Sequence, residues 1–401
     1  MYTAFVRHLC GSHILDDILN SISICTARIY KNFDTLTRTN FISLMTIVKP
    51  ARNYGLDILR VIACYMVIQI HTGEFYYIGN MGLTLNTADA SWVGWYNSLC
   101  RVCVPLFVMI SGFYLFPVID TSAFFKKRMS RVAIPFILWC ILYAFYYYFM
   151  GQIDLQTALT NILKIPVNYG VEIGHLWFVY MLLGLYLIAP IISPWVQSAS
   201  RGVIEFYLTL WGIAFSLPYI HLIFPEIWGE AFWNHTPMLY YFSGFLGYVV
   251  LANYIKRFHM QQRPGHYALG VVLIIAGYAI TTFGFLHHLP TEKYVNTLEL
   301  TWGFETINVA MMTAGVFLLF KNIAIKNPSA PLAKLVLDIA AKSYGIYLAH
   351  IMVLNAWHAT LDKYFDTAAI KIPLIALSTF ITVYIGIKIL SYLPKSKWLV
   401  G

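Results

Sequence analysis

Arg60 and His71 stand out because they are ionisable side chains in an otherwise apolar run, GLDILRVIACYMVIQIH. Ionisable groups inside a membrane-spanning helix are costly and usually serve a function. The two residues are 11 positions apart, almost a whole number of helical turns, so they share one helix face with roughly 16 Å of rise between them. Asp57 and Cys64 fall on the same stripe. This arrangement predicts a cation near one membrane surface that can hold an anionic ligand, and a deeper imidazole that can do proton chemistry.

Two arginines in the stretch FFKKRMSRVAIPF form a second candidate site. Arg128 and Arg131 are one helical turn apart, and arginine pairs at this spacing can hold phosphates through paired hydrogen bonds. They also belong to a basic cluster of the kind that marks a cytoplasmic loop. Upstream, Ser111 and Gly112 are small residues that leave room for a ligand or for a neighbouring helix. Each motif therefore has both a binding and a structural interpretation.

The composition predicts a multi-pass membrane protein. The chain has 401 residues, of which 59% are hydrophobic and 11% charged, whereas soluble domains carry about 25% charged residues. The net charge of +9 does not indicate nucleic-acid binding. Lys and Arg instead cluster in short breaks between apolar stretches, as cytoplasmic loops of membrane proteins do.

The first 50 residues differ from the rest of the chain. They are more polar and contain no run of about 20 apolar residues that could cross a membrane. Met45 begins MTIVKPARNYGLDILR, a suitable cytoplasmic start. The first 44 residues are therefore either a surface amphipathic segment or an over-extended gene start. We expect a polar extension at residues 1–50, which need not belong to the native start, and a transmembrane domain at residues 51–401.

Ten apolar spans follow, and they predict an all-α membrane protein, a bundle of about ten transmembrane helices. The spans run roughly over residues 55–78, 93–117, 133–150, 175–196, 202–222, 236–254, 267–286, 301–320, 340–361 and 372–393. The breaks between them alternate between many cations and few. If all ten spans cross the membrane, every basic break falls on one side, which places both termini in the cytoplasm.

Arg101 is predicted to lie at nearly the same depth as His71. His71 lies about 24 Å along the first, outward-running span, and Arg101 about 12 Å below the outer surface on the second. The short break at residues 79–92 favours packing of these spans as neighbours, and Pro105 is expected to kink the second. We expect His71 and Arg101 to be catalytic. The alternative is that each pairs structurally or extends its polar end toward the membrane surface.

Other polar residues give weaker signals. Glu172, His175, Glu305 and His350 fall in or near apolar spans, and each is either a ligand contact or a structural residue. Cys100 and Cys103 have the spacing of a redox pair but lie in an apolar helix, so we expect ordinary buried thiols. The sequence contains no Walker loop, no dinucleotide fingerprint and no metal-spaced His/Cys set, and no metal is expected.

The sequence resembles the acyltransferase 3 family of integral-membrane acyltransferases. The stretches that carry the resemblance are LDILRVIACYMVIQIH, RVCVPLFVMISGFYL, RMSRVAIPF, HLWFVYMLLGLYLIAP, YYFSGFLGYVV and SYGIYLAH. They occur in family order over most of residues 54–360, and residues 1–50 lie outside them.

The resemblance implies a ten-helix core that takes an acyl group from cytoplasmic acyl-CoA. It also implies delivery of that group to a glycan or lipid-linked sugar at the outer side of the bacterial inner membrane. By residue, Arg60 and His71 match the family's Arg-x10-His pair, and Arg128 and Arg131 match its RxxR motif. No acidic partner of His71 can be matched, and Glu172 and Glu305 are the candidates.

These features together predict an O-acyltransferase, and more narrowly an O-acetyltransferase that uses acetyl-CoA. His71 is expected to act as general base and Arg101 to stabilise negative charge or orient the acyl carbonyl. A transient acyl-His71 is a less favoured variant. Arg60, Ser111, Arg128 and Arg131 are expected to bind the donor, with its pantetheine arm threaded past Ser111. The alternatives are a transporter of a small anion or glycolipid, or an acyltransferase-derived sensor that binds acyl-CoA without turnover.

Overall fold

The computed structural model describes residues 52–167, 171–224 and 244–400. The chain divides into two units, Met1–Arg52 and Asn53–Gly401, and the fold below is that of the second unit. The predicted polar extension at residues 1–50 lies outside the described residues. The described ranges are almost entirely helical and contain no β-strand, which confirms the predicted all-α class.

Eight described segments are long and apolar enough to cross a membrane, and a ninth is a bent pair. The eight are α3 (Tyr54–Glu74), α4 (Ala88–Cys100) with α5 (Cys103–Leu115), α6 (Thr121–Phe149), α8 (Trp177–Ser198), α9 (Arg201–Ile223), α11 (Pro264–His288), α14 (Pro331–Leu361) and α15 (Ala368–Leu390). The bent pair joins α12 (Val295–Leu298) and η5 (Glu299–Trp302) to α13 (Ile307–Phe320) at 40°. The shorter elements are η1 (Asn80–Gly82), α7 (Leu155–Lys164), η2 (Val171–Leu176), α10 (Leu246–Phe258), η6 (Asp362–Tyr364) and α16 (Lys397–Val400).

The predicted count of about ten differs from this at one span. Residues 236–254 were expected to cross the membrane, but residues 225–243 are outside the described part of the chain. Residues 246–254 of that span belong to the 13-residue α10, which continues to Phe258. The predicted cytoplasmic location of both termini stays a prediction.

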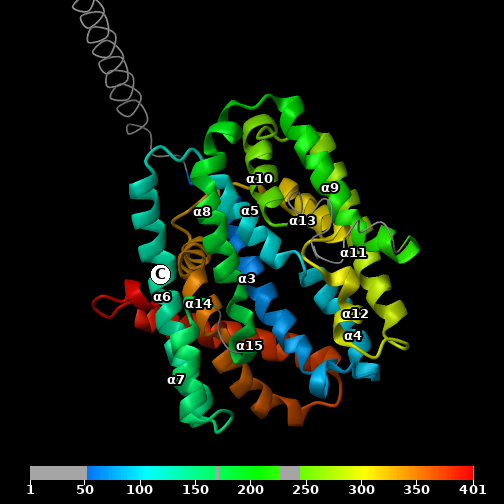
Figure 1. The fold of residues 1–401 in the computed structure, drawn as a ribbon, viewed down its shortest axis with the longest axis vertical. Coiled ribbons are helices and arrows are strands. Elements are labelled where there is room, and N and C mark those ends of the chain that lie inside the picture. The colour runs from blue at the N-terminus through cyan, green and yellow to red at the C-terminus, as the bar shows by residue number, and fades with distance from the viewer. Residues whose placement is uncertain (1–51, 168–170, 225–243, 401) are drawn as a thin grey trace, which may run out of the picture. The chain divides into compact units, whose positions relative to one another are not determined.

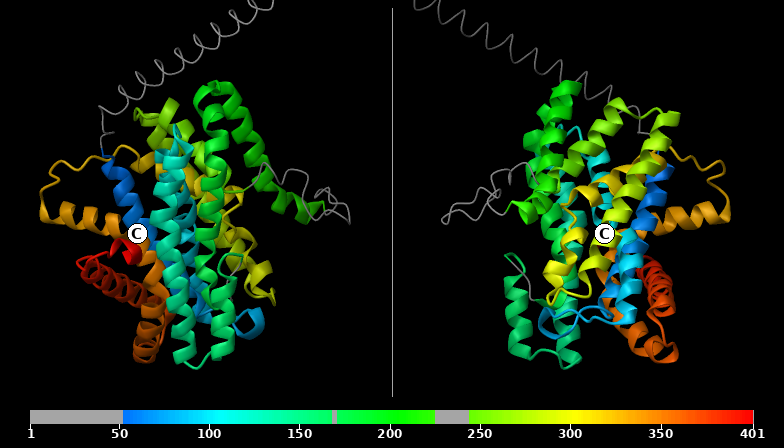
Figure 2. Two further views of the ribbon diagram at one scale, coloured as in Figure 1. Left: turned by 60° about the vertical axis from the view of Figure 1, so that its left-hand side comes forward. Right: turned by 90° about the vertical axis from the view of Figure 1, so that its right-hand side faces the viewer.

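Helix α3 is an interior helix of the unit. It packs against α4, α5, α13, α14 and α15, and α14 and α15 lie beside it in Figure 1 and in the two views of Figure 2. Its most apolar stretch is 61% buried, whereas the corresponding stretches of α9 and α11 are only 28% buried. The peripheral helices therefore carry the apolar surface that a bilayer would cover, and α3 places its polar side chains inside the protein.

The start of α3 is fixed by Asn53. Its side-chain oxygen accepts a hydrogen bond from the backbone N–H of Leu56 at 3.2 Å, which satisfies one of the free donors of the first turn. Its side-chain nitrogen donates to the carbonyl oxygen of Lys321 at 2.7 Å. One residue therefore caps the helix and ties it to the end of α13.

The second predicted span is not one continuous helix. Helix α4 ends at Cys100 and α5 begins at Cys103, so Arg101 lies in the break. Pro105 explains the position, because proline has no N–H to donate to the carbonyl four residues earlier and its ring clashes with that carbonyl. The expected kink therefore falls at Arg101, one turn before the proline.

Gly112 serves helix packing rather than a ligand. A Cβ atom at this position would lie 2.8 Å from the Cα atom of Val249, in α10. Of the two roles that the sequence left open for Gly112, this contact supports helix packing, since the small residue allows α5 to approach α10 closely.

Candidate active site

Three neighbouring cavities are lined by residues of α3 and its partners. The Arg60 cavity has a volume of about 160 Å³, the His71 cavity about 250 Å³ and the His358 cavity about 770 Å³. Phe178 and Tyr347 line both the Arg60 and the His71 cavities. The His71 and His358 cavities share His71, Glu74, His175 and Trp177. The cavities therefore form a row with the His71 cavity in the middle.

His71 and Glu74 form a hydrogen-bonded pair in the central cavity. The Nδ1 atom of His71 lies 3.0 Å from the Glu74 carboxylate, three residues further along α3. Because an ionised carboxylate only accepts hydrogen bonds, Nδ1 carries the proton in this pair. The Nε2 atom of neutral His71 then has a free lone pair, so the arrangement can act as a general base.

Sequence reasoning missed Glu74 as the acidic partner. The candidates were Glu172, whose side chain is outside the described residues, and Glu305, which is exposed and is not among the residues that line the His71 cavity. The sequence could have indicated Glu74, because it lies three positions after His71 and side chains at this spacing on a helix are neighbours.

Arg101 lines the same cavity as His71. Its guanidinium lies 4.3 Å from the centre of the Trp302 ring and its Nη2 atom 3.7 Å from the Glu299 carboxylate. The side chain is 7% exposed. Its Nε atom is buried and has no hydrogen-bond partner among the described residues. A fixed cation with an unused donor is suited to stabilising negative charge that develops during a reaction.

Two further contacts hold this arginine assembly in place. The Tyr77 hydroxyl donates to the Glu299 carboxylate, and the Trp302 indole N–H donates to Ser98 at 2.9 Å. Burial and the negative charge of Glu299 raise the pKa of Tyr77 well above 10.0, so the phenol remains a donor. Because Glu299 and Trp302 come from η5, some 200 residues after Arg101 in the sequence, no local pattern pointed to them.

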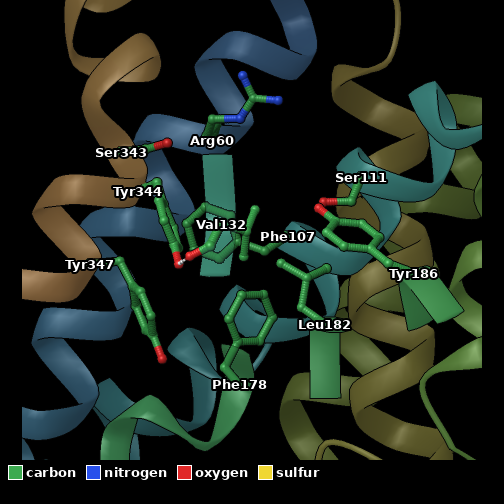
Figure 3. Close-up of a pocket in the computed structure, with 10 residues that line it drawn as sticks. All are labelled: Arg60, Phe107, Ser111, Val132, Phe178, Leu182, Tyr186, Ser343, Tyr344 and Tyr347. Carbon is green, nitrogen blue, oxygen red and sulfur yellow. Dashed lines mark hydrogen bonds between the residues drawn. The ribbon is translucent and has the colours of Figure 1, made fainter. Parts of the chain in front are cut away.

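Arg60 and Ser111 line the cavity on the other side of Phe178 and Tyr347. Figure 3 shows Arg60 at one end of this cavity, with Phe178 and the Tyr347 hydroxyl toward the opposite end. The Arg60 Nη1 atom lies 3.4 Å from the Asp57 carboxylate. The Tyr344 hydroxyl donates to the Val132 carbonyl at 2.8 Å across the cavity wall (Figure 3). The cavity thus offers a cation at its end and aromatic side walls.

Arg128 and Arg131 lie on α6, as the RxxR pattern predicts, close to the Arg60 cavity but outside its lining. The Arg128 guanidinium lies 5.3 Å from the ring centre of Tyr186, and Tyr186 lines the cavity. Arg131 is exposed, and its chain neighbour Val132 lines the cavity. Arg128 therefore borders the cavity through Tyr186, and Arg131 lies one turn further along α6.

His175 and His350 lie next to His71. The ring centres are 6.2 Å apart for His71 and His175, 5.3 Å for His71 and His350, and 5.2 Å for His175 and His350. The His350 Nδ1 atom lies 2.5 Å from the carbonyl oxygen of Tyr347. Because a carbonyl oxygen only accepts hydrogen bonds, Nδ1 carries the proton and Nε2 of the neutral ring is an acceptor. The Nε2 atoms of both residues are buried without a hydrogen-bond partner in the described ranges. The topology therefore gathers two residues that gave only weak signals in the sequence.

No group of three or more His, Cys, Asp or Glu side chains within the described ranges could hold a metal ion. This applies to the group formed by His71, His175 and His350. Cys64, Cys100, Cys103 and Cys140 are buried free thiols. The CxxC spacing therefore forms no disulfide.

A family model described as an acyltransferase domain, acyltransferase 3, matches residues 53–391. The chain belongs to the acyltransferase 3 family. The match covers all three cavities, and the described helices agree with a multi-pass membrane protein. Membership of this family indicates a membrane acyltransferase. No curated protein and no solved structure matches the chain.

Proposed function

We propose that this membrane acyltransferase is an O-acetyltransferase of the bacterial inner membrane. It transfers an acetyl group from cytoplasmic acetyl-CoA to a hydroxyl group of a cell-surface polysaccharide or its lipid-linked precursor. One observation carries the proposal: the His71–Glu74 pair and Arg101 line one cavity. A base and a cation around one reacting centre are what transfer from a thioester to a hydroxyl needs.

The base step follows from the protonation of His71. As the acceptor oxygen attacks the thioester carbonyl, the Nε2 atom of His71 takes the hydroxyl proton and a C–O bond forms. Glu74 stabilises the resulting imidazolium through its hydrogen bond to Nδ1. The C–S bond then breaks, and the leaving CoA sulfur takes from Nε2 the proton that came from the acceptor hydroxyl. Atoms and charge balance without a covalent enzyme intermediate.

Arg101 is the proposed stabiliser of the oxyanion. Its buried Nε–H is an available donor, and the contacts to Glu299 and Trp302 hold the guanidinium without occupying that atom. Charge stabilisation by a preorganised donor in a site that excludes water is a large contribution to acyl transfer.

The Arg60 cavity is the proposed donor site. Arg60, Arg128 and Arg131 would hold the phosphates of CoA, because guanidinium groups bind phosphate through paired hydrogen bonds. The pantetheine arm would pass Ser111 and the Phe178–Tyr347 boundary to reach the His71 cavity. Val67, Ile70 and Val104 line that cavity, whose volume of about 250 Å³ favours a short acyl group over a long chain.

A resemblance supports the acceptor class. The arrangement IHT…SLCRVCVPLFVMISG, at residues 70–72 and 98–112, resembles that of the O-acetyltransferase that modifies enterobacterial common antigen. This favours a sugar hydroxyl on a surface polysaccharide or on its membrane-bound precursor. Family membership favours the enzyme over the alternative of a transporter.

The test is release of free CoA by the purified full-length protein supplied with acetyl-CoA and an extract of lipid-linked glycans. We expect CoA release coupled to an added mass of one acetyl group on the glycan. A transporter should give neither product, and a non-catalytic sensor should bind acetyl-CoA without releasing CoA. Either result would contradict the proposed function.

A further inference from the structure

The His358 cavity is the largest of the three, and the proposed donor does not occupy it. Its volume of about 770 Å³ is within the range of roughly 300–1,000 Å³ typical of small-molecule sites. It meets the His71 cavity at His71 and Glu74. A molecule bound here therefore has access to the proposed base from the side opposite the Arg60 cavity.

Aromatic rings form much of the wall of this cavity. The Phe75 ring stacks on the His358 ring, with ring centres 3.7 Å apart and planes 14° apart. Tyr146, Tyr147 and Trp177 also line the cavity. Flat aromatic faces pack well against the C–H face of a pyranose ring, where the hydroxyl groups point sideways.

Uncharged hydrogen-bonding groups accompany these rings. Gln152 and Asn355 line the cavity, and the Asn355 amide nitrogen lies 3.4 Å from the Tyr146 hydroxyl. Each carboxamide offers donors and an acceptor. Side-chain amides and phenols at the edge of aromatic faces match the alternating donors and acceptors of sugar hydroxyl groups.

The described lining of the cavity offers no permanently charged cation to an acidic ligand. Its described lining contains no Lys or Arg, and its one carboxylate, Glu74, is paired with His71. The nearby Lys371 is paired with Asp362 at 3.0 Å, and Asp362 also accepts a hydrogen bond from Tyr76 at 2.9 Å. A phosphate or uronate in the cavity would therefore be an unpaired charge, which is costly in a partly buried site.

We propose that the His358 cavity binds an uncharged sugar residue of the acceptor. One hydroxyl of that residue faces His71 Nε2, and its C–H face packs on the aromatic wall that includes Phe75. Asn355 and Gln152 hydrogen-bond to the other hydroxyls. This inference rests on the proposed function, and it adds the acceptor site and its selection against acidic sugars.

The first test uses variants of full-length enzyme. We expect Asn355→Ala and Phe75→Ala each to raise the KM for a sugar acceptor about tenfold, the effect of losing one good contact. The KM for acetyl-CoA should not change, since neither residue lines the Arg60 cavity. Thr360→Ala is the matched control, since Thr360 is exposed on the same helix as Asn355, does not line the cavity, and donates to the Ala356 carbonyl one turn earlier. Parental sugar KM values in both Asn355→Ala and Phe75→Ala would overturn the inference.

The second test compares charge at constant shape. Methyl glucoside with methyl glucuronide, and methyl galactoside with methyl galacturonide, differ only at C6. We expect at least one neutral glycoside to accept acetyl groups or to compete with the glycan, and its uronide to be at least tenfold poorer. Equal use of a uronide and its neutral partner, or no interaction with any neutral glycoside, would overturn the inference. CoA release with the glycan extract in the same preparation would still support the proposed function, so the two failures are distinguishable.

Discussion

The Nδ1 atom of His71 lies 3.0 Å from the Glu74 carboxylate, and both residues are on α3. The helix itself sets their separation, because residues three positions apart lie on the same side of consecutive turns. The pair therefore needs no long-range contact to bring its members together. The hydrogen bond to Glu74 occupies Nδ1 and orients the imidazole. In the proposed mechanism, Nε2 takes the proton of the acceptor hydroxyl.

Glu74→Gln should lower kcat while leaving acetyl-CoA affinity unchanged. The amide keeps a hydrogen-bond acceptor beside Nδ1 but removes the negative charge that stabilises the imidazolium. We expect kcat to fall about a hundredfold or more, as measured by steady-state CoA release. Glu292→Gln is the control, since Glu292 lies 3.7 Å from His288 in a similar pair outside the three cavities. A Glu74→Gln enzyme with parental kcat would remove Glu74 from the mechanism.

Arg101→Lys should lower kcat about 10²–10³-fold, as loss of one oxyanion donor does in other enzymes. Lysine keeps the positive charge near Glu299 but has no Nε donor and no planar fork. Thermal unfolding of the variant in detergent checks that the fold survives. If both Arg101→Lys and Arg101→Gln fold and turn over at the parental rate, Arg101 has no role at the reacting carbonyl.

The sequence predicted the helices that carry the site better than the contacts between the site's side chains. Periodicity put Arg60 and His71 on one face of an apolar helix, and the apolar runs located most spans, because both signals are local. Glu299 and Trp302 were not foreseen, since they approach Arg101 only through a bent segment distant in sequence. Glu74 was missed because the acidic candidates, Glu172 and Glu305, came from other segments of the chain.

Helix packing decided several positions that the sequence left open. Ser111 lines the Arg60 cavity, whereas its neighbour Gly112 packs against α10. The two readings could not be separated by residue type, since small residues serve both purposes. The position of the helix break, at Arg101, likewise could not be read from Pro105 alone, since a proline fixes only approximately where a helix is interrupted.

Arg60→Ala, and the double change of Arg128 and Arg131 to Ala, should weaken acetyl-CoA binding more than sugar binding. Loss of a charge-assisted contact to phosphate costs about 1.5–3 kcal/mol, or roughly ten- to a hundredfold in Kd. Lysine replacements should recover only part of the loss. Arg201→Ala is the control, because Arg201 pairs with Glu205 at the exposed start of α9.

Titration of acetyl-CoA by calorimetry measures these effects. Cysteine-accessibility mapping must accompany it, since removal of basic residues can also invert membrane topology. Variants with correct topology that bind acetyl-CoA like the parent would contradict the donor assignment.

The row of cavities predicts sidedness of the reaction. In sealed vesicles of known orientation, acetyl-CoA should act only from the face that carries Arg60, Arg128 and Arg131, and free CoA should return to that face. The acetylated glycan should appear at the opposite face. Equal activity with acetyl-CoA from either side would rule out delivery of the acetyl group past Phe178 and Tyr347. It would not contradict the assignment of the protein as an acyltransferase.

The most direct test of the central claim is acetyl transfer by purified His71→Ala, measured beside its acetyl-CoA affinity. The Arg60 cavity does not include His71, so donor binding should stay close to the parental value. Without Nε2 to take the hydroxyl proton, acetyl transfer to the glycan should fall to background. Transfer at a near-parental rate by this variant would contradict the assignment of His71 as the catalytic base.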